Sequence, residues 1–217
     1  TQAGSVLFVV GQAQSVAADP GQALTGEPDR IIPLGCKWDY SLSEPNTLVL
    51  DRITASPDGG ETWWDEDLEH RVRHRLAQHF GTTDALLWQP WVAIRKGIFN
   101  GKGGPIVLRY RFWSTLEKPG TFLVMEDIQK CEVTVNGQAV DVSSAVWHWD
   151  RGFGKVDISA LVQKGENLIE ARVNYDFQTE IEPAYLVGDF GVELKSPTTP
   201  QIIESPSMLV SGSWKDQ

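Results

Sequence analysis

The stretch Cys131-Glu-Val-Thr-Val-Asn136-Gly137-Gln-Ala-Val140 decides the fold class of this chain. Val133 and Val135 alternate with polar residues, and a period of two is typical of a strand with one buried face. Asn136-Gly137 follows this run. The dipeptide is the strongest short-range signal of a β-hairpin, because a type I′ turn needs positive φ at both central residues. The stretch therefore predicts antiparallel strands joined by tight turns.

The alternation continues outward over the segment from Pro105 to Leu194. Its apolar residues stand two apart in three runs: Leu108, Tyr110 and Phe112; Ile169, Ala171 and Val173; and Phe190, Val192 and Leu194. The run Thr121-Phe-Leu-Val-Met125 is apolar and predicts a central strand. Short strands at regular turn spacing predict an all-β fold, an antiparallel sandwich or jelly roll.

A different period marks the segment around residues 65–80. Apolar residues recur here every four positions, at Leu68, Val72, Leu76 and Phe80. Acidic residues stand at the start of the segment and Arg and His towards its end, which complements the helix dipole, and Gly81 can cap the C-terminus. We therefore predict one amphipathic helix, inserted around residues 65–80 and packed against the sandwich.

Further strands are predicted before this helix. Val6–Val10 is a β-branched run, and Asn46–Asp51 has the pattern of a buried strand. Ser56-Pro-Asp-Gly-Gly60 places Pro and Gly where a tight reversal needs them. We expect one β-sandwich module over residues 1–195. Residues 196–217 are rich in Pro, Ser and Thr and are expected to be a linker or an edge extension.

Composition excludes two classes of partner. The chain has 217 residues, 41% of them hydrophobic, which is enough to bury a core without a disulfide framework. Its net charge of −10 argues against nucleic acid, because binding to phosphates requires clustered Lys and Arg. No apolar run approaches the roughly 20 residues of a membrane span. The two cysteines, Cys36 and Cys131, are expected to be buried free thiols rather than a disulfide.

Several motifs of the central segment follow one another in a recognisable order. A strand ending in Val133-Thr-Val-Asn-Gly137 precedes a tryptophan-bearing loop, then Val156-Asp-Ile-Ser159, then Lys164-Gly-Glu-Asn167 and an alternating strand. Over residues 105–194 this order resembles the galactose-binding-like jelly roll, the sugar-binding β-sandwich of family 2-type and related large bacterial glycoside hydrolases. Asn46–Asp51 with its following turn, and Tyr185-Leu-Val-Gly-Asp-Phe-Gly-Val192, are similar to the accessory sandwich of α-L-rhamnosidase-type enzymes.

The resemblance implies an accessory module without catalytic residues, because in such enzymes the catalytic carboxylates lie on a separate barrel. It implies two partners, a polysaccharide or oligosaccharide and an adjacent catalytic domain in the same polypeptide. An extracellular or periplasmic location is expected by this association. No cofactor is expected, although modules of this type often hold a structural Ca²⁺ through carbonyls and a carboxylate.

Nine tryptophans are more than a core of this size needs: Trp38, Trp63, Trp64, Trp88, Trp91, Trp113, Trp147, Trp149 and Trp214. An exposed indole offers a flat apolar face to a pyranose ring, but a buried indole is the commoner case. The best candidate site is the cluster Trp147-His148-Trp149-Asp150-Arg151, between two predicted strands. Strand alternation would put Trp147 and Trp149 on one face and His148 on the other. Trp63 and Trp64, which flank the helix, are secondary candidates, and both sets can equally be packing residues.

Other reactive side chains give weaker signals. His70 and His74 are one helical turn apart, yet three arginines beside them would oppose a dication, so we expect exposed histidines rather than a zinc site. Carboxylates that could serve a glycosidase are plentiful, but sequence does not show their placement; they include Glu126, Asp127, Glu180, Glu182 and Asp189.

The sequence therefore favours a noncatalytic carbohydrate-binding module of a larger carbohydrate-active enzyme. The nearest alternative is an architectural domain that braces a neighbouring glycosidase domain without affinity for sugar. A glycoside hydrolase in its own right, or adhesion to another protein through exposed aromatic residues, is less favoured.

Overall fold

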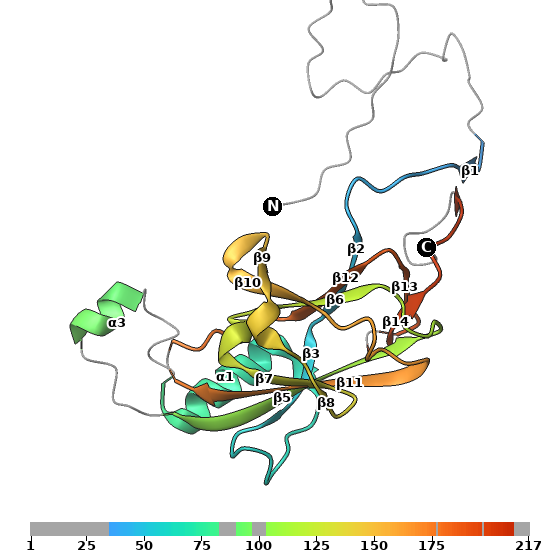
Figure 1. Ribbon diagram of the computed structural model, residues 1–217. Helices are drawn as coiled ribbons and strands as arrows, with labels where there is room; N and C mark the ends of the chain where they lie inside the picture. Colours follow the sequence, from blue (N-terminus) through green and yellow to red (C-terminus); the bar gives the residue numbers. More distant parts are fainter. Residues whose placement is uncertain (1–34, 83–89, 97–102, 177, 197, 211–217) are drawn as a thin grey trace, which may run out of the picture. The chain divides into compact units, whose positions relative to one another are not determined.

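The computed structural model describes residues 35–82, 90–96, 103–176, 178–196 and 198–210. The chain divides into two compact units, residues 1–35 and 36–217, and all the elements below belong to the second unit. The strand predicted at Val6–Val10 and the residues Trp88 and Trp214 lie outside the described residues. The described part is mostly β-structure, arranged in sheets that are almost entirely antiparallel (Figure 1).

One sheet has five strands in the order β2-β12-β6-β10-β9, all paired antiparallel. Their bounds are β2 (Asn46–Leu50), β12 (Ala184–Gly188), β6 (Thr121–Glu126), β10 (Asp150–Asp157) and β9 (Val146–His148). β6 lies in the middle of this order, so the predicted central strand is confirmed.

The second sheet runs in the order β13-β14-β5-β11-β7-β8, with β3 also paired to β5 and β4 paired to β3. Its strands are β3 (Arg52–Ser56), β4 (Asp67–Leu68), β5 (Gly104–Ser114), β7 (Glu132–Val135), β8 (Gln138–Ala139), β11 (Gly165–Tyr175), β13 (Gly191–Leu194) and β14 (Pro200–Ile203). The pairing of β14 with β5 is parallel, and the others are antiparallel. A separate pair joins β1 (Lys37–Trp38) to β15 (Leu209–Val210).

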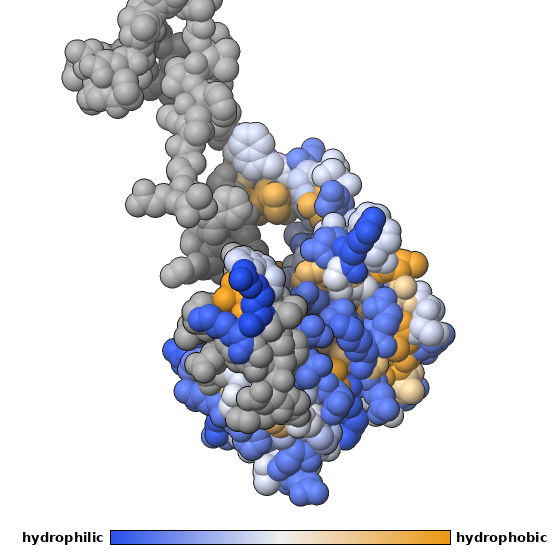
Figure 2. Space-filling model, turned by 90° about the vertical axis from the view of Figure 1, so that its left-hand side faces the viewer, coloured by the Kyte–Doolittle hydropathy of each residue, from blue (hydrophilic) through white to orange (hydrophobic). Residues whose placement is uncertain are grey.

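One hydrophobic core lies between the inner faces of the two sheets. On β5, Leu108, Tyr110 and Phe112 are buried while Arg111 is exposed, as the alternation predicts. On the five-stranded sheet, Leu48, Leu123 and Leu186 are in the same core. The outer surface is largely polar: hydrophilic residues predominate on the face in Figure 2, and hydrophobic residues gather along one side of it.

The predicted hairpin is present at Asn136-Gly137, which joins β7 to β8 with φ of 51° and 78°. Asn136 also uses its side chain, because its Nδ2 donates to the Leu161 carbonyl and to Asn167 Oδ1 and its Oδ1 accepts from Leu168 N–H. Asn167 in turn accepts from Gln163 N–H and donates to the Gln163 and Gly165 carbonyls. Two asparagines therefore join the hairpin to the reversal that precedes β11.

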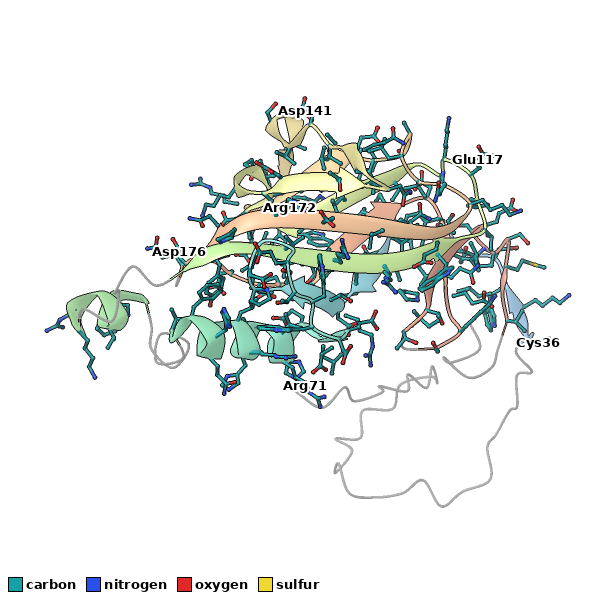
Figure 3. All side chains as sticks on the ribbon, turned by 90° about the horizontal axis from the view of Figure 1, so that it is seen from below. Cys36, Arg71, Glu117, Asp141, Arg172 and Asp176 are labelled. Atoms are coloured by element: carbon teal, nitrogen blue, oxygen red, sulfur yellow. The ribbon has the colours of Figure 1, made fainter. Side chains whose placement is uncertain are left out.

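The helix α1 (Glu69–Phe80) occupies the predicted place but begins four residues later than residue 65. Asp67 and Leu68 form β4, because their backbones pair with Arg52 and Ile53 of β3. Val72, Leu76 and Ala77 are buried, and Gly81 ends the helix in the left-handed conformation with φ of 66°, as expected for a C-cap. Arg71 points away from the sheets (Figure 3).

Three further short helices are described: α3 (Pro90–Lys96), η1 (Ile128–Lys130) and η2 (Val142–Ser144). The sequence analysis predicted none of them. Within the described ranges, no helix has the length and apolar character needed to cross a lipid bilayer.

Both cysteines are free thiols, as predicted, but they are not both buried. Cys36 is exposed, which corrects the prediction, because it lies just before the two-residue strand β1, outside the core. Cys131 is partly buried, and burial raises the pKa of its thiol to about 11. The Cys131 thiol is therefore protonated at neutral pH and a poor nucleophile.

Candidate functional site

The hairpin of β9 and β10 presents two tryptophans to solvent, Trp147 within β9 and Trp149 in the turn between the strands. Trp147 has 70% of its surface exposed and Trp149 has 49%. Trp149 adopts a left-handed φ of 62°, a strained conformation for a bulky side chain. The register between the strands shifts between Asp150 and Gly154, so β10 carries a bulge directly after the turn. β9 ends at His148, and Trp149 follows it with this left-handed φ, so the regular strand alternation expected over Trp147, His148 and Trp149 does not extend to Trp149.

Trp149 packs with Phe153 and Tyr185, which lie on the outer face of the five-stranded sheet. We call these three residues the aromatic cluster. Trp149 meets Tyr185 edge to face at 5.1 Å between ring centroids and Phe153 at 6.1 Å, and Phe153 meets Tyr185 at 5.8 Å. His148 also packs against Trp149, with 4.6 Å between the ring centroids and the two rings tilted by 41°. Edge-to-face contacts of this kind stabilise ring positions, so Trp149 is held in place while half of its surface stays in contact with solvent.

The polar members of the predicted cluster lie around these rings. Asp150 Oδ1 accepts a hydrogen bond from Gly152 N–H at 2.7 Å, which supports the bulge. Arg151 is exposed. Partial burial, together with the nearby Lys155 ammonium, lowers the pKa of His148, so its imidazole is neutral at neutral pH. A neutral imidazole offers one donor and one acceptor to a ligand.

Trp63 and Trp64 belong to a different place in the fold. The Arg109 guanidinium lies over the Trp63 ring at 3.5 Å, and Arg109 belongs to β5 in the second sheet. Trp64 carries the Arg75 guanidinium at 4.1 Å and packs against the core and His79 of α1. Both indoles are partly buried with one ring face covered by an arginine. The structure does not bring them together with the aromatic cluster.

Two members of the aromatic cluster, Phe153 and Tyr185, were not predicted as site residues. Tyr185 alternates with the buried residues Ala184 and Leu186, and its Cα is paired with Val124 of β6, so it lies on the outer face. Phe153 pairs with Glu126. An aromatic residue at an outward position of a strand is a usable signal, but the contact with Trp149 depends on the strand order, which the sequence does not give.

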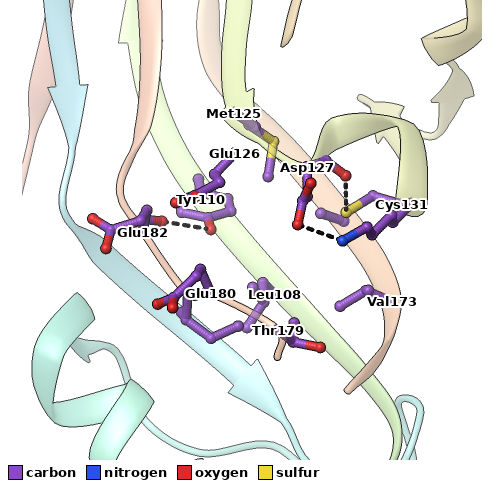
Figure 4. Close-up of a pocket in the computed structure, with 13 residues that line it drawn as sticks. Leu108, Tyr110, Met125, Glu126, Asp127, Cys131, Val173, Thr179, Glu180 and Glu182 are labelled. Carbon is purple, nitrogen blue, oxygen red and sulfur yellow. Dashed lines mark hydrogen bonds and ion pairs between the residues drawn. The ribbon is translucent and has the colours of Figure 1, made fainter. Parts of the chain in front are cut away.

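The carboxylates noted in the sequence converge on a small pocket at one end of the sheets (Figure 4). Glu126, Asp127, Glu180 and Glu182 all line it, whereas Asp189 does not. Tyr110 also lines the pocket and donates its hydroxyl to the Glu182 carbonyl at 3.4 Å. The cavity volume is about 40 Å³, close to the ~30 Å³ that one water molecule occupies in the liquid. It is therefore too small to hold a pyranose ring.

The acidic residues near this pocket repel one another. Burial raises the pKa of Glu126, and the charges of Glu182 and Glu180 raise it further. Burial also raises the pKa of Glu69 at the start of α1, despite the Arg73 Nε that lies 3.7 Å from Glu69 Oε1. The same Glu69 oxygen has no hydrogen-bond partner among the described residues.

We expect Glu69→Gln to reduce the pH dependence of stability. Because the pKa of Glu69 is higher in the folded state, its contribution to stability is complete below the unfolded-state pKa and is lost as pH rises through the folded-state value. From about pH 4 to about pH 7 the free energy of unfolding should therefore fall less in the variant than in the wild type. Urea unfolding at both pH values measures this, with exposed Glu132→Gln as the control. Equal pH dependence in all three proteins would contradict the prediction.

Within the described residues, no group of three or more His, Cys, Asp and Glu side chains is arranged to hold a metal ion. His70 and His74 are both exposed, as predicted. A structural Ca²⁺ bound largely through backbone carbonyls stays a suggestion of the family resemblance.

A larger open groove of about 770 Å³ lies where the edges of the two sheets meet. β2 and β13 are terminal in their strand orders, so each has one edge that pairs with no other strand of the described residues. Leu48 and Leu50 of β2, with Val192 and Leu194 of β13, contribute an apolar lining. The groove contains no aromatic residue among those that line it, which makes it a poor platform for a sugar ring.

No family model matches this chain, and a search of curated proteins finds no significant match.

Proposed function

We propose that this chain is a noncatalytic carbohydrate-binding module with a jelly-roll fold, part of a larger extracellular or periplasmic carbohydrate-active enzyme. The observation that carries the proposal is the exposure of two tryptophans, Trp147 and Trp149, in one short hairpin beside a supporting set of rings. The order of motifs between residues 105 and 194, which resembles the sugar-binding domain of family 2-type glycoside hydrolases, supports the jelly-roll fold in this proposal.

The physical basis is the match between an indole face and the axial C–H groups of a pyranose. Trp149 is fixed by Tyr185 and Phe153, so little conformational entropy is lost when a sugar stacks on it. Trp147 is more exposed and offers a second flat surface two residues away. Asp150, Arg151 and the neutral His148 are close enough in sequence to supply donors and acceptors for hydroxyl groups.

We expect the double variant Trp147→Ala, Trp149→Ala to lose retardation in affinity electrophoresis across a panel of polysaccharides. Loss of about 1–3 kcal/mol of ring contact corresponds to roughly a tenfold to hundredfold weaker affinity. The matched control is Trp38→Ala, which removes an exposed indole outside the cluster. Circular dichroism should show that all variants are folded. If the wild type is retarded and the double variant is retarded equally, the site is elsewhere.

The architectural alternative has one observation in its favour, the apolar groove between the free edges of β2 and β13. A free strand edge and an apolar groove are features on which a neighbouring domain can dock. If this is the function, no polysaccharide will retard the wild type, and a co-expressed adjacent domain will form a stable complex with it. Lysine substitution at Val49, an exposed residue of β2 that lines the groove, should then weaken that complex.

Hydrolysis by this chain itself is not proposed. The carboxylates that the fold gathers line a pocket of about 40 Å³, and a glycosidase must place two of them on opposite sides of a sugar.

A further inference from the structure

The aromatic cluster has carboxylates at its border. Glu126 is the cross-strand partner of Phe153, so the two side chains leave the same face of the sheet side by side. Gly152 lies between two acids: a Cβ added there would be 3.2 Å from Glu126 Oε1 and 3.3 Å from Asp150 Oδ1. Two carboxylates therefore flank the start of the strand that carries Phe153.

These carboxylates are not neutralised within the described part of the chain. Neither Glu126 nor Asp150 forms an ion pair there, whereas Asp127 pairs with Lys130 and Glu182 with Arg73. Lys155 of the same strand forms no ion pair with either acid: it lies over the Phe122 ring at 5.2 Å, and its charge acts on His148. Burial and the surrounding acids raise the pKa of Glu126, which is the response of a carboxyl in a region of negative potential.

We propose that the aromatic cluster selects glycans that carry ammonium groups, 2-amino sugars, over neutral glycans and over uronic acids. The inference rests on the proposed function, since it names the sugar class for the same site. An ammonium group near the face of Trp149 or Tyr185 gains a cation–π attraction, and Glu126 and Asp150 add charge-assisted hydrogen bonds. A uronate carboxylate would meet two acids and be repelled.

Isothermal titration calorimetry with three soluble oligosaccharides of equal length tests this. The ligands are a glucosamine oligomer, its N-acetylated counterpart and a galacturonate oligomer, at a pH where the amine is protonated. We expect the glucosamine oligomer to bind about tenfold more tightly than the N-acetylated one, and the galacturonate oligomer most weakly.

The double variant Glu126→Gln, Asp150→Asn should bind the two glucosamine-based oligomers about equally. The matched control is Glu117→Gln, at an exposed residue. Glu117 precedes β6, whereas Glu126 is the last residue of that strand. Figure 3 shows Glu117 at the end of the sheets opposite Asp176. This control removes one negative charge away from the cluster and should keep the preference.

The outcomes separate the two proposals. Equal affinity of the wild type for both glucosamine-based oligomers overturns the sugar class alone. A preference that the acidic double variant retains has the same consequence. Binding of the amino sugar that survives loss of Trp147 and Trp149 shows that the site lies elsewhere, and it overturns the proposed site together with the sugar class. If no oligosaccharide and no polysaccharide binds, the carbohydrate-binding function itself is wrong.

Discussion

Replacing Asn167 with leucine should lower the free energy of unfolding by about 3 kcal/mol or more. Asn167 is fully buried, and its side chain forms four hydrogen bonds with groups that would remain in place. A leucine of similar size would leave the Gln163 N–H, two carbonyls and the Asn136 amide without that partner. Each unsatisfied buried polar group costs about 1–3 kcal/mol, and some will find other partners.

Urea unfolding followed by tryptophan fluorescence measures the loss. The matched control is Asn174→Leu, the same change at an exposed position of the same strand β11, which should alter stability by less than about 0.5 kcal/mol. If the Asn167 variant is as stable as this control, the two asparagines do not hold the hairpin and the reversal together.

Replacing Gly188 with alanine should be comparably damaging. A Cβ on Gly188 would lie 2.1 Å from the Gly120 carbonyl oxygen and 2.8 Å from the Phe190 ring. The strand cannot easily move aside, because Gly188 is paired with Thr121 of β6 and with Asn46 of β2. Overpacking of this kind typically costs 1–3 kcal/mol, and a clash with backbone places the variant at about 3 kcal/mol or above.

Differential scanning calorimetry should show a lower Tm by about 6–12 °C, since 1 kcal/mol corresponds to about 2–4 °C for a chain of this size. Gly120→Ala provides the control, because a Cβ on Gly120 has no atom within 4 Å and its backbone is outside the positive-φ region. If the Gly188 variant has the same Tm as this control, β12 and β6 tolerate a wider spacing and the prediction is wrong.

The motif order that suggested a sugar-binding family also has a structural explanation. Val-Asn-Gly, the residues around Leu161 and Lys-Gly-Glu-Asn meet because Asn136 and Asn167 bond to each other and to the backbone of all three segments. The spacing of these motifs is therefore a requirement of packing. It supports a type of fold and does not by itself point to a ligand.

Local patterns were sufficient for much of the fold. The hairpin at Asn136-Gly137 is set by the backbone freedom of two residues, and the inward positions of β5 and β11 follow from period two. The start of α1 was placed too early, because the acids before Glu69 were assigned to a first turn. The backbone of Asp67 instead pairs with Ile53 of β3, and a periodicity argument over the helical segment does not include that earlier strand.

In the candidate site, too, local sequence patterns predicted some features and tertiary contacts decided the others. The sequence alone predicted tryptophans in a loop between two strands, because strand alternation and turn residues are local properties of the chain. The structure places Trp149 in the turn and Trp147 in the short strand β9 that precedes it. Only the tertiary structure decided that Trp149 faces Tyr185, that Phe153 completes the aromatic cluster and that Glu126 borders it. Those contacts join β6, β10 and β12, and the order of strands in a sheet is fixed by burial of one shared core rather than by any single segment.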